Sequence, residues 1–139
     1  MSPTPHGPGF SFLDSFEVTL PARQGRGRKW LDPKLAFFAE HFPGKPLMPG
    51  VLLIECGAQA AGALWASIRP NDASAHFTLA QIVQFKIQHP VLPGEIVETD
   101  VVLERAFGSL AQFDVTLTVN QTEVARGRLV LSAPAIGTG

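Results

Sequence analysis

PGVLLIECGAQAAGALWASI, residues 49–68, is the stretch from which the fold of this 139-residue chain can be argued. Proline is tolerated at the start of a helix, because the N–H that it lacks would have no partner there. The run then stays apolar until Pro70, which is followed by the turn residues Asn71 and Asp72. The stretch therefore predicts one long helix, from near Pro49 to just before Pro70, whose many small residues allow close packing on more than one face.

The apolar run Val51–Ile68 is near the length that crosses a bilayer. It contains Glu55 and Gln59, however, and a carboxylate at membrane depth is expensive. The amphipathic strands elsewhere in the chain also need a helix to cover them. We therefore expect a buried core helix and no membrane span.

Downstream of this helix the apolar residues recur with a period of two, which is typical of strands. In the first expected strand one face would carry Phe77, Leu79, Val83, Phe85 and Ile87. Further strands are expected over Val97–Leu103, Ala111–Val119 and Val124–Leu131. The turn pairs Pro93-Gly94, Phe107-Gly108 and Asn120-Gln121 join them. Short turns of this kind make consecutive strands antiparallel neighbours.

Two more strands, Phe16–Leu20 and Gly27–Leu31, precede the helix, and Pro33–Phe38 is expected to form a short helical turn. The pattern predicts an α+β fold in which a curved antiparallel sheet wraps one long helix. We expect a single domain over residues 1–139, with loose ends at about 1–5 and 133–139. Because a sheet shields only one face of so apolar a helix, we also expect a homodimer.

Bulk composition excludes several functions. The net charge of −1 and the pI of about 6.4 give no support for nucleic-acid binding. The single cysteine, Cys56, allows no intrachain disulfide, and no secretory signal is visible at the N-terminus, so we expect a reducing, cytoplasmic location. Four histidines and one cysteine show no metal-ligand spacing, so no metal or other cofactor is expected.

The segment just before the helix, residues 41–49, contains a candidate group for proton transfer. Three prolines within residues 43–49 restrict the backbone and would hold His41 in place. Gly50 lies in the expected first turn, where backbone N–H groups lack partners and the positive end of the helix dipole lies. Glu55 follows about 7 to 8 Å further along the axis, at ~1.5 Å per residue. An imidazole, a carboxyl group and a carbonyl-polarising N–H suit proton removal beside a carbonyl and protonation of a leaving group. From these residues alone, His41 and Glu55 can equally be read as hydrogen-bonded structural residues.

The stretch from residue 41 to 59 closely resembles the FabZ-type 3-hydroxyacyl-[acyl-carrier-protein] dehydratases. Their signature reads roughly G-H-F-P-G-x-P-x-M-P-G-V-L-x-I-E-x-x-A-Q. This chain has HFPGKPLMPGVLLIECGAQ. The resemblance extends more loosely to Pro5-His6, Phe10 and Asp14, which would order residues 5 to 14, and to residues 90–95, PVLPGE.

The resemblance implies a hotdog fold and a cofactor-free site shared between the two subunits of a homodimer, with trimers of dimers also known in the family. His41 would remove the Cα proton, and Glu55 would assist departure of the β-hydroxyl. The Gly50 N–H would polarise the thioester carbonyl, and Gln59 would orient Glu55. Phe42 and Val51, within the same stretch, are the remaining candidates for substrate contact. The substrate would be carried by acyl carrier protein, and the product would be a trans-2-enoyl thioester.

The sequence departs from the family pattern at several positions where basic residues or glycines are usual: Gly7, Ser15, Glu40, Gln81, Gln88 and His89. Carrier proteins are acidic, so the loss of cations indicates a specialised relative, acting in fatty-acid or related polyketide or polyene biosynthesis. The alternatives are a hotdog thioesterase, in which Glu55 would activate water, and a non-catalytic hotdog subunit that binds acyl chains.

Overall fold

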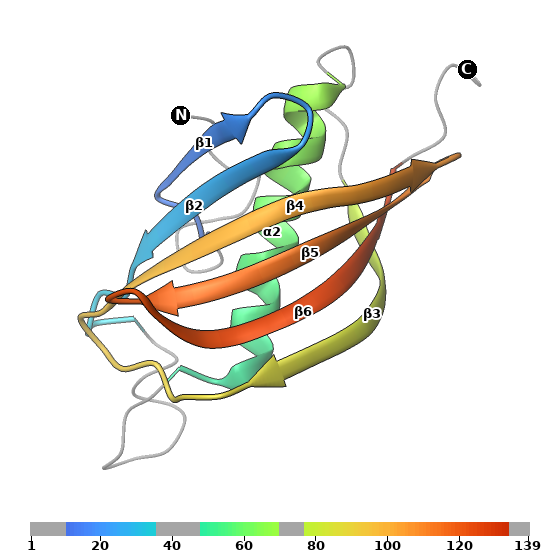
Figure 1. Ribbon diagram of the computed structural model, residues 1–139. Coiled ribbons are helices and arrows are strands. Elements are labelled where there is room, and N and C mark those ends of the chain that lie inside the picture. The colour runs from blue at the N-terminus through green and yellow to red at the C-terminus, as the bar shows by residue number, and fades with distance from the viewer. Residues whose placement is uncertain (1–10, 36–47, 70–76, 134–139) are drawn as a thin grey trace.

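The computed structural model describes residues 11–35, 48–69 and 77–133. In these ranges one helix, α2 (Gly50–Ile68), lies against a six-stranded antiparallel sheet. The strands are β1 (Ser15–Leu20), β2 (Gln24–Trp30), β3 (Thr78–Ile87), β4 (Ile96–Phe107), β5 (Leu110–Val119) and β6 (Thr122–Ser132), in the order β1-β2-β4-β5-β6-β3. Figure 1 shows the sheet curving around the helix. The predicted α+β fold is confirmed.

Helix α2 begins one residue after Pro49 and ends before Pro70, as predicted. The residues that it buries are Leu53, Cys56, Gly57, Gln59, Ala60, Ala61, Leu64 and Trp65. A Cβ at Gly57 would lie 3.1 Å from Val115 and 3.2 Å from Leu129, so the missing side chain lets the helix approach β5 and β6 closely. By length and composition α2 could cross a membrane, a test that the core helix of a globular fold also passes. Here it packs on the sheet.

The three predicted turns downstream of α2 are present, but only the second and third join neighbouring strands. The expected pairing of β3 with β4 across Pro93-Gly94 is wrong, because β3 pairs with β6 at the edge of the sheet and β4 pairs with β2 and β5. Gly94 and Gly108 have φ of +86° and +61°, which glycine adopts without strain. Asn120 and Gln121 have φ of +50° and +67°, the pattern of a two-residue type I′ hairpin turn. The second and third turns fix the β4–β5 and β5–β6 pairings, in which Val101 faces Val115 and Val115 faces Gly127.

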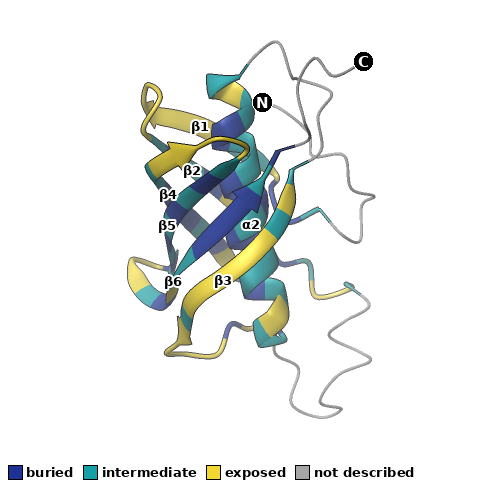
Figure 2. Cartoon of the chain, turned by 90° about the vertical axis from the view of Figure 1, so that its right-hand side faces the viewer, coloured by how far each residue is buried: buried dark blue, intermediate teal, exposed yellow. Residues whose placement is uncertain are grey.

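Strand β3 differs from the expected alternation. Its pairing with β6 shifts register between Leu79 and Gln81 and again between Ile82 and Gln84. Each extra residue moves the following side chains to the other face of the sheet. Leu79, Ile82, Phe85 and Ile87 therefore stand opposite the helix-facing residues Leu131, Leu129, Gly127 and Ala125 of β6. Val83, expected on that face, is the extra residue of the second shift and is 43% exposed. Figure 2 shows β3 as an exposed edge strand.

Other boundaries shift by a few residues. Strand β2 starts at Gln24, three residues earlier than expected, and ends at Trp30. Only the start of the expected helical turn over Pro33–Phe38 is described, where Pro33 and Lys34 form a turn. Ala133, expected at the start of a loose tail, is buried and donates its N–H to the Ser109 carbonyl oxygen at 2.7 Å. The rest of that tail, and residues 1–5, lie outside the described residues.

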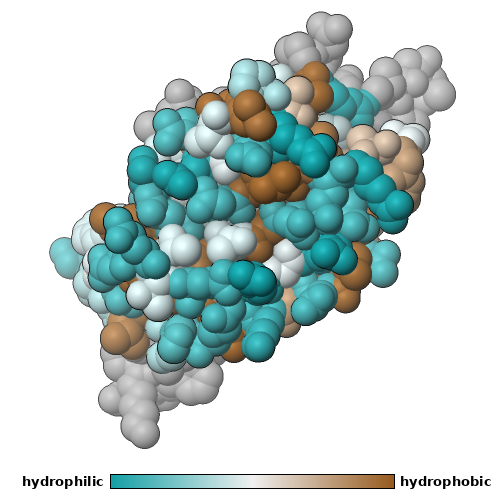
Figure 3. Space-filling model, viewed as in Figure 1, coloured by the Kyte–Doolittle hydropathy of each residue, from teal (hydrophilic) through white to brown (hydrophobic). Residues whose placement is uncertain are grey.

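The outer face of the sheet, turned away from α2, is mostly hydrophilic (Figure 3). Cross-strand ion pairs join Arg26 to Asp100 at 2.7 Å and Arg28 to Glu98 at 2.6 Å. Arg128 contacts both Glu104 and Asp114, at 3.1 and 3.2 Å. These carboxylates raise the pKa of Arg26 and Arg128 above the ordinary value. Arg26, Arg28 and Arg128 are thus each paired with carboxylates of the same sheet face.

Candidate functional site

The described part of the site centres on two polar side chains of α2. Glu55 and Gln59 are one helical turn apart, and therefore lie on the same face of the helix. The Gln59 amide nitrogen Nε2 donates to Glu55 Oε1 at 3.1 Å. Gln59 is only 7% exposed, whereas Glu55 is half-buried in the single chain. This hydrogen bond is a contact through which Gln59 could orient Glu55, and the orienting role itself stays a prediction.

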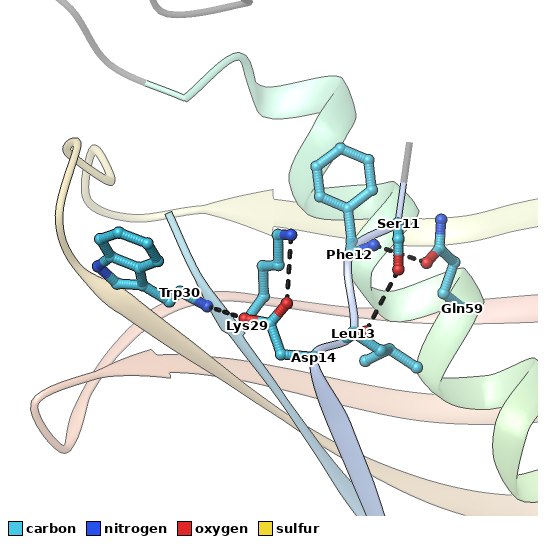
Figure 4. A network of polar contacts seen from close by, with 7 residues as sticks. All are labelled: Ser11, Phe12, Leu13, Asp14, Lys29, Trp30 and Gln59. Carbon is cyan, nitrogen blue, oxygen red and sulfur yellow. Dashed lines mark hydrogen bonds and ion pairs between the residues drawn. The ribbon is translucent and has the colours of Figure 1, made fainter. Parts of the chain in front are cut away.

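A backbone group outside the helix holds the other end of the Gln59 amide. The Phe12 N–H donates to Gln59 Oε1 at 2.8 Å, across a buried contact that is drawn in Figure 4. With Oε1 engaged by this donor, Nε2 must face Glu55. The opposite orientation would set two donors against each other at Phe12 and two acceptors against each other at Glu55.

Residues just after Phe12 tie the same segment to strand β2. The Asp14 N–H donates to the Arg28 carbonyl oxygen at 2.6 Å, and the Asp14 carboxylate accepts from the Trp30 N–H at 2.7 Å. Asp14 also pairs with the ammonium group of Lys29 at 3.3 Å. In Figure 4 the carboxylate lies between these two partners. Sequence reasoning matched Asp14 to a family pattern but assigned no role to it, and it did not anticipate Phe12 or Lys29.

The helix start holds two more predicted residues. Gly50 is the first residue of α2, as predicted, so its N–H lies in the turn where backbone donors have no acceptor within the helix. A Cβ at Gly50 would lie 2.5 Å from the Ile87 side-chain terminus. Val51 is 68% exposed, the largest exposure among the large apolar side chains in the described part of the chain. Both therefore remain candidates for substrate contact.

His41 and Phe42 lie outside the described residues, so the predicted pairing of His41 with Glu55 stays a prediction. The chain on either side of residues 36–47 is anchored at one place. The Met48 N–H donates to the Val91 carbonyl oxygen at 2.8 Å, and the Leu31 N–H donates to that of Glu95 at 2.9 Å. The Gly94 N–H returns a bond to the Leu31 carbonyl oxygen at 2.6 Å. The 90–95 turn thus holds both flanks of the segment that contains His41.

Cys56 is adjacent to Glu55 but points into the core. Burial, and then the Glu55 carboxylate, raise the pKa of the Cys56 thiol well above its ordinary value. The thiol therefore stays protonated at neutral pH, which removes the thiolate that a cysteine nucleophile needs. Within the described ranges no three His, Cys, Asp or Glu side chains gather closely enough to bind a metal ion.

One helix wrapped by a six-stranded antiparallel sheet defines a hotdog-fold protein, and its helix carries a glutamate that is hydrogen-bonded to a glutamine. The family model of the ApeI-like dehydratases matches residues 20–128. The curated FabZ of Herpetosiphon aurantiacus, a 3-hydroxyacyl-[acyl-carrier-protein] dehydratase, is 32% identical over 92% of this chain and 90% of its own. The FabZ of Acidiphilium cryptum is also 32% identical, over 90% of this chain and 76% of its own. The chain therefore belongs to the ApeI-like and FabZ-type hotdog dehydratases, which confirms the predicted hydro-lyase class.

Solved structures support the fold. The dehydratase heterocomplex ApeI:P from Xenorhabdus doucetiae superposes with a TM-score of 0.76, covers 95% of this chain and 88% of its own, and is 17% identical. A putative thioesterase from Lactococcus lactis superposes with a TM-score of 0.64 over 81% of this chain and 79% of its own, at 12% identity. Proteins named as dehydratases and as thioesterases thus share this architecture, so the fold alone does not distinguish the two activities. The sequence relatives and the family model, which are dehydratases, favour the first.

Proposed function

We propose that this protein dehydrates 3-hydroxyacyl thioesters carried by acyl carrier protein to trans-2-enoyl thioesters. His41 takes the Cα proton, and the electron pair of the broken Cα–H bond forms the new Cα–Cβ double bond. The Cβ–O bond breaks, and the departing hydroxyl takes a proton from Glu55, directly or through a water, and leaves as water. The Gly50 N–H stabilises the negative charge that develops on the thioester oxygen. Phe42 and Val51 contact the acyl chain.

The observation that carries this proposal is the Glu55–Gln59 pair. A catalytic acid must be held in one orientation while its protonation state changes, and Gln59 supplies a fixed donor to one oxygen of Glu55. That donor is itself fixed by the Phe12 N–H.

A homodimer, open to further assembly as a trimer of dimers, is part of the proposal. Edge strand β3 exposes apolar residues, among them Ile82 at 46%, and Val51 stands exposed near Ile87 at the helix start. Exposed apolar residues along an unpaired sheet edge favour pairing with another chain. The hollow of about 270 Å³ on the outer face is lined by polar groups such as Gln84 and Arg126 rather than by Glu55. We therefore place the acyl chain at a subunit interface beside Glu55.

Product analysis tests the reaction. Purified protein is given a 3-hydroxyacyl thioester on acyl carrier protein, and ultraviolet absorbance and mass spectrometry follow the product. We expect an enoyl thioester lighter by one water. Free acid and free thiol would instead establish the thioesterase, and an unchanged substrate that nonetheless binds would establish the non-catalytic subunit. Equal turnover of ordinary fatty-acyl substrates by this protein and a housekeeping dehydratase would contradict a specialised pathway.

Mixing two inactive variants tests the shared site. If His41 of one subunit works with Glu55 of the other, a dimer of His41→Ala and Glu55→Gln chains has one intact site. Random re-formation of dimers from equal amounts should restore about a quarter of the wild-type rate, since half of the dimers are mixed. No recovery, with mixed dimers demonstrated by mass spectrometry, would show that each site lies within one chain.

A cytoplasmic location, where acyl carrier protein is present, is also part of the proposal.

A further inference from the structure

We infer that residues Ser11–Asp14, here called the N-terminal strap, form a positioning element for Glu55, and that Asp14 is the residue that fixes it. The inference rests on the proposed function for its catalytic consequence. Its structural content, that Asp14 determines the orientation of the Gln59 amide, can be measured without turnover.

The strap contacts Gln59 through the Phe12 backbone N–H. Phe12 and Leu13 are 2% and 5% exposed, so this part of the strap is packed in the core rather than laid on the surface. The Phe12 N–H is the group that makes the two ends of the Gln59 amide unequal. If that N–H moves away, the preference for presenting Nε2 rather than Oε1 to Glu55 weakens, and an acceptor facing the carboxylate would repel it.

Strand β2 is shaped to receive the strap. A Cβ at Gly27 would lie 2.3 Å from the Leu13 side chain, so Leu13 occupies the space that the glycine leaves open. One residue later the backbone joins the sheet, through the bond from the Asp14 N–H to the Arg28 carbonyl oxygen. Within the strap, the Ser11 hydroxyl donates to the Leu13 carbonyl oxygen at 3.3 Å. Figure 4 shows the strap between strand β2 and the helix, with Gln59 at one end and Asp14 at the other.

Asp14 is the charged anchor of this arrangement. Its carboxylate accepts from the Trp30 N–H and pairs with Lys29, whose side chain is 11% exposed while that of Asp14 is 50% exposed. A nearly buried ammonium group is costly without a partner, so Lys29 holds Asp14 in place as much as Asp14 holds the backbone of β2. Phe12 is only two residues from Asp14, so fixing Asp14 also restricts the position of the Phe12 N–H that donates to Gln59.

Kinetics of five variants test the inference. Asp14→Ala should lower kcat by about tenfold or more, with KM nearly unchanged, because a small misplacement of a catalytic group is enough to cost that much. Asp14→Asn, whose one amide oxygen can accept from the Trp30 N–H but no longer forms the ion pair with Lys29, should recover only part of kcat. Asp14→Ala combined with Gln59→Ala should be no slower than Gln59→Ala alone, because both changes act through one amide. Asp100→Asn, which breaks the outer-face pair with Arg26, should leave both constants unchanged.

Nuclear magnetic resonance of the Gln59 side-chain amide tests it independently of activity. Asp14→Ala should shift the two Nε2 proton signals and speed their exchange with water by about tenfold, whereas Asp100→Asn should not. Unmoved Gln59 signals in Asp14→Ala would overturn the inference, whatever the enzyme does. If Asp14→Ala shifts the Gln59 signals but the wild-type protein does not dehydrate its substrate, the inference about the strap is upheld and the proposed function is rejected. Multiplicative loss of kcat in the double variant would show that Asp14 acts by a route other than Gln59, and would also overturn the inference.

Discussion

Two glutamine–glutamate pairs, one on each side of the sheet, make nearly the same hydrogen bond. On α2 the Gln59 amide donates to Glu55 at 3.1 Å, and on the outer face the Gln112 amide donates to Glu104 at 3.0 Å. The surroundings differ. Gln59 is buried and has a second fixed partner in the Phe12 N–H, whereas Glu104 shares Arg128 with Asp114 on a hydrophilic surface. Chemistry at these two places therefore differs through burial and second partners, and not through the contact itself.

The largest expected difference between the two pairs is in rate. Glu55→Gln should lower kcat by about a hundredfold or more, because the amide cannot transfer a proton to the departing hydroxyl. Glu104→Gln removes the same charge from the outer face and should leave kcat unchanged. Steady-state dehydration rates measure both. Equal losses in the two variants would mean that net charge, and not the position of Glu55, determines activity.

The second largest difference between the two pairs is expected in the free energy of unfolding. Gln59→Leu removes the side-chain acceptor of a buried backbone N–H, and we expect it to lower the free energy of unfolding by about 1–3 kcal/mol. Gln112→Leu, on a more open surface, should change it by about 0.5 kcal/mol or less. Urea unfolding followed by circular dichroism measures both values. If Gln112→Leu were as costly as Gln59→Leu, the strap contact would have no special energetic role.

Which features could be predicted from the sequence becomes clear when helix α2 is compared with the groups that contact it. The helix bounds and Gly50 at its first turn followed from local signals, namely a proline start and a proline stop, whereas the role of Gln59 toward Glu55 came only from the family resemblance. The two hairpin turns, β4–β5 and β5–β6, were equally local, whereas the pairing of β3 with β6 was not. The bulges of β3 were not local either, because the register shift that moves Val83 off the helix-facing side arises from pairing with β6. Alternation in one strand carries no information about its partner.

The strap was missed for a related reason. Phe12 acts through its backbone N–H, which every residue except proline has, so no side-chain pattern marks it. Asp14 and Lys29 are far from Glu55 in sequence and become relevant only when β2 and α2 are packed together. The one available signal was the match of Asp14 to the family pattern, which indicated importance without a mechanism.

A pH experiment extends the comparison to the thiol beside Glu55. Because burial raises the pKa of Cys56, the folded state keeps the thiol protonated while the unfolded chain ionises near its ordinary value of 9.0. The unfolded state thus gains stability as the pH rises above 9, so the free energy of unfolding should fall there, by at most about 1.4 kcal/mol per pH unit. Cys56→Ala should show a shallower fall over the same range. Identical slopes in the two proteins would place the thiol in water, contrary to its packing.

The smallest effect is expected on the outer face. Arg28 and Glu98 are in contact at 2.6 Å, but their side chains are 47% and 30% exposed, so water and salt screen the pair. A double-mutant cycle with Arg28→Ala and Glu98→Ala should give a coupling energy of about 0.5 kcal/mol or less, which vanishes at about 1 M salt. The same cycle applied to Asp14 and Lys29 should give a larger coupling that survives salt, because Lys29 is nearly buried. Equal coupling energies and equal salt dependence would mean that the strap is anchored no more firmly than a surface ion pair, and Asp14 could then not fix the orientation of Gln59.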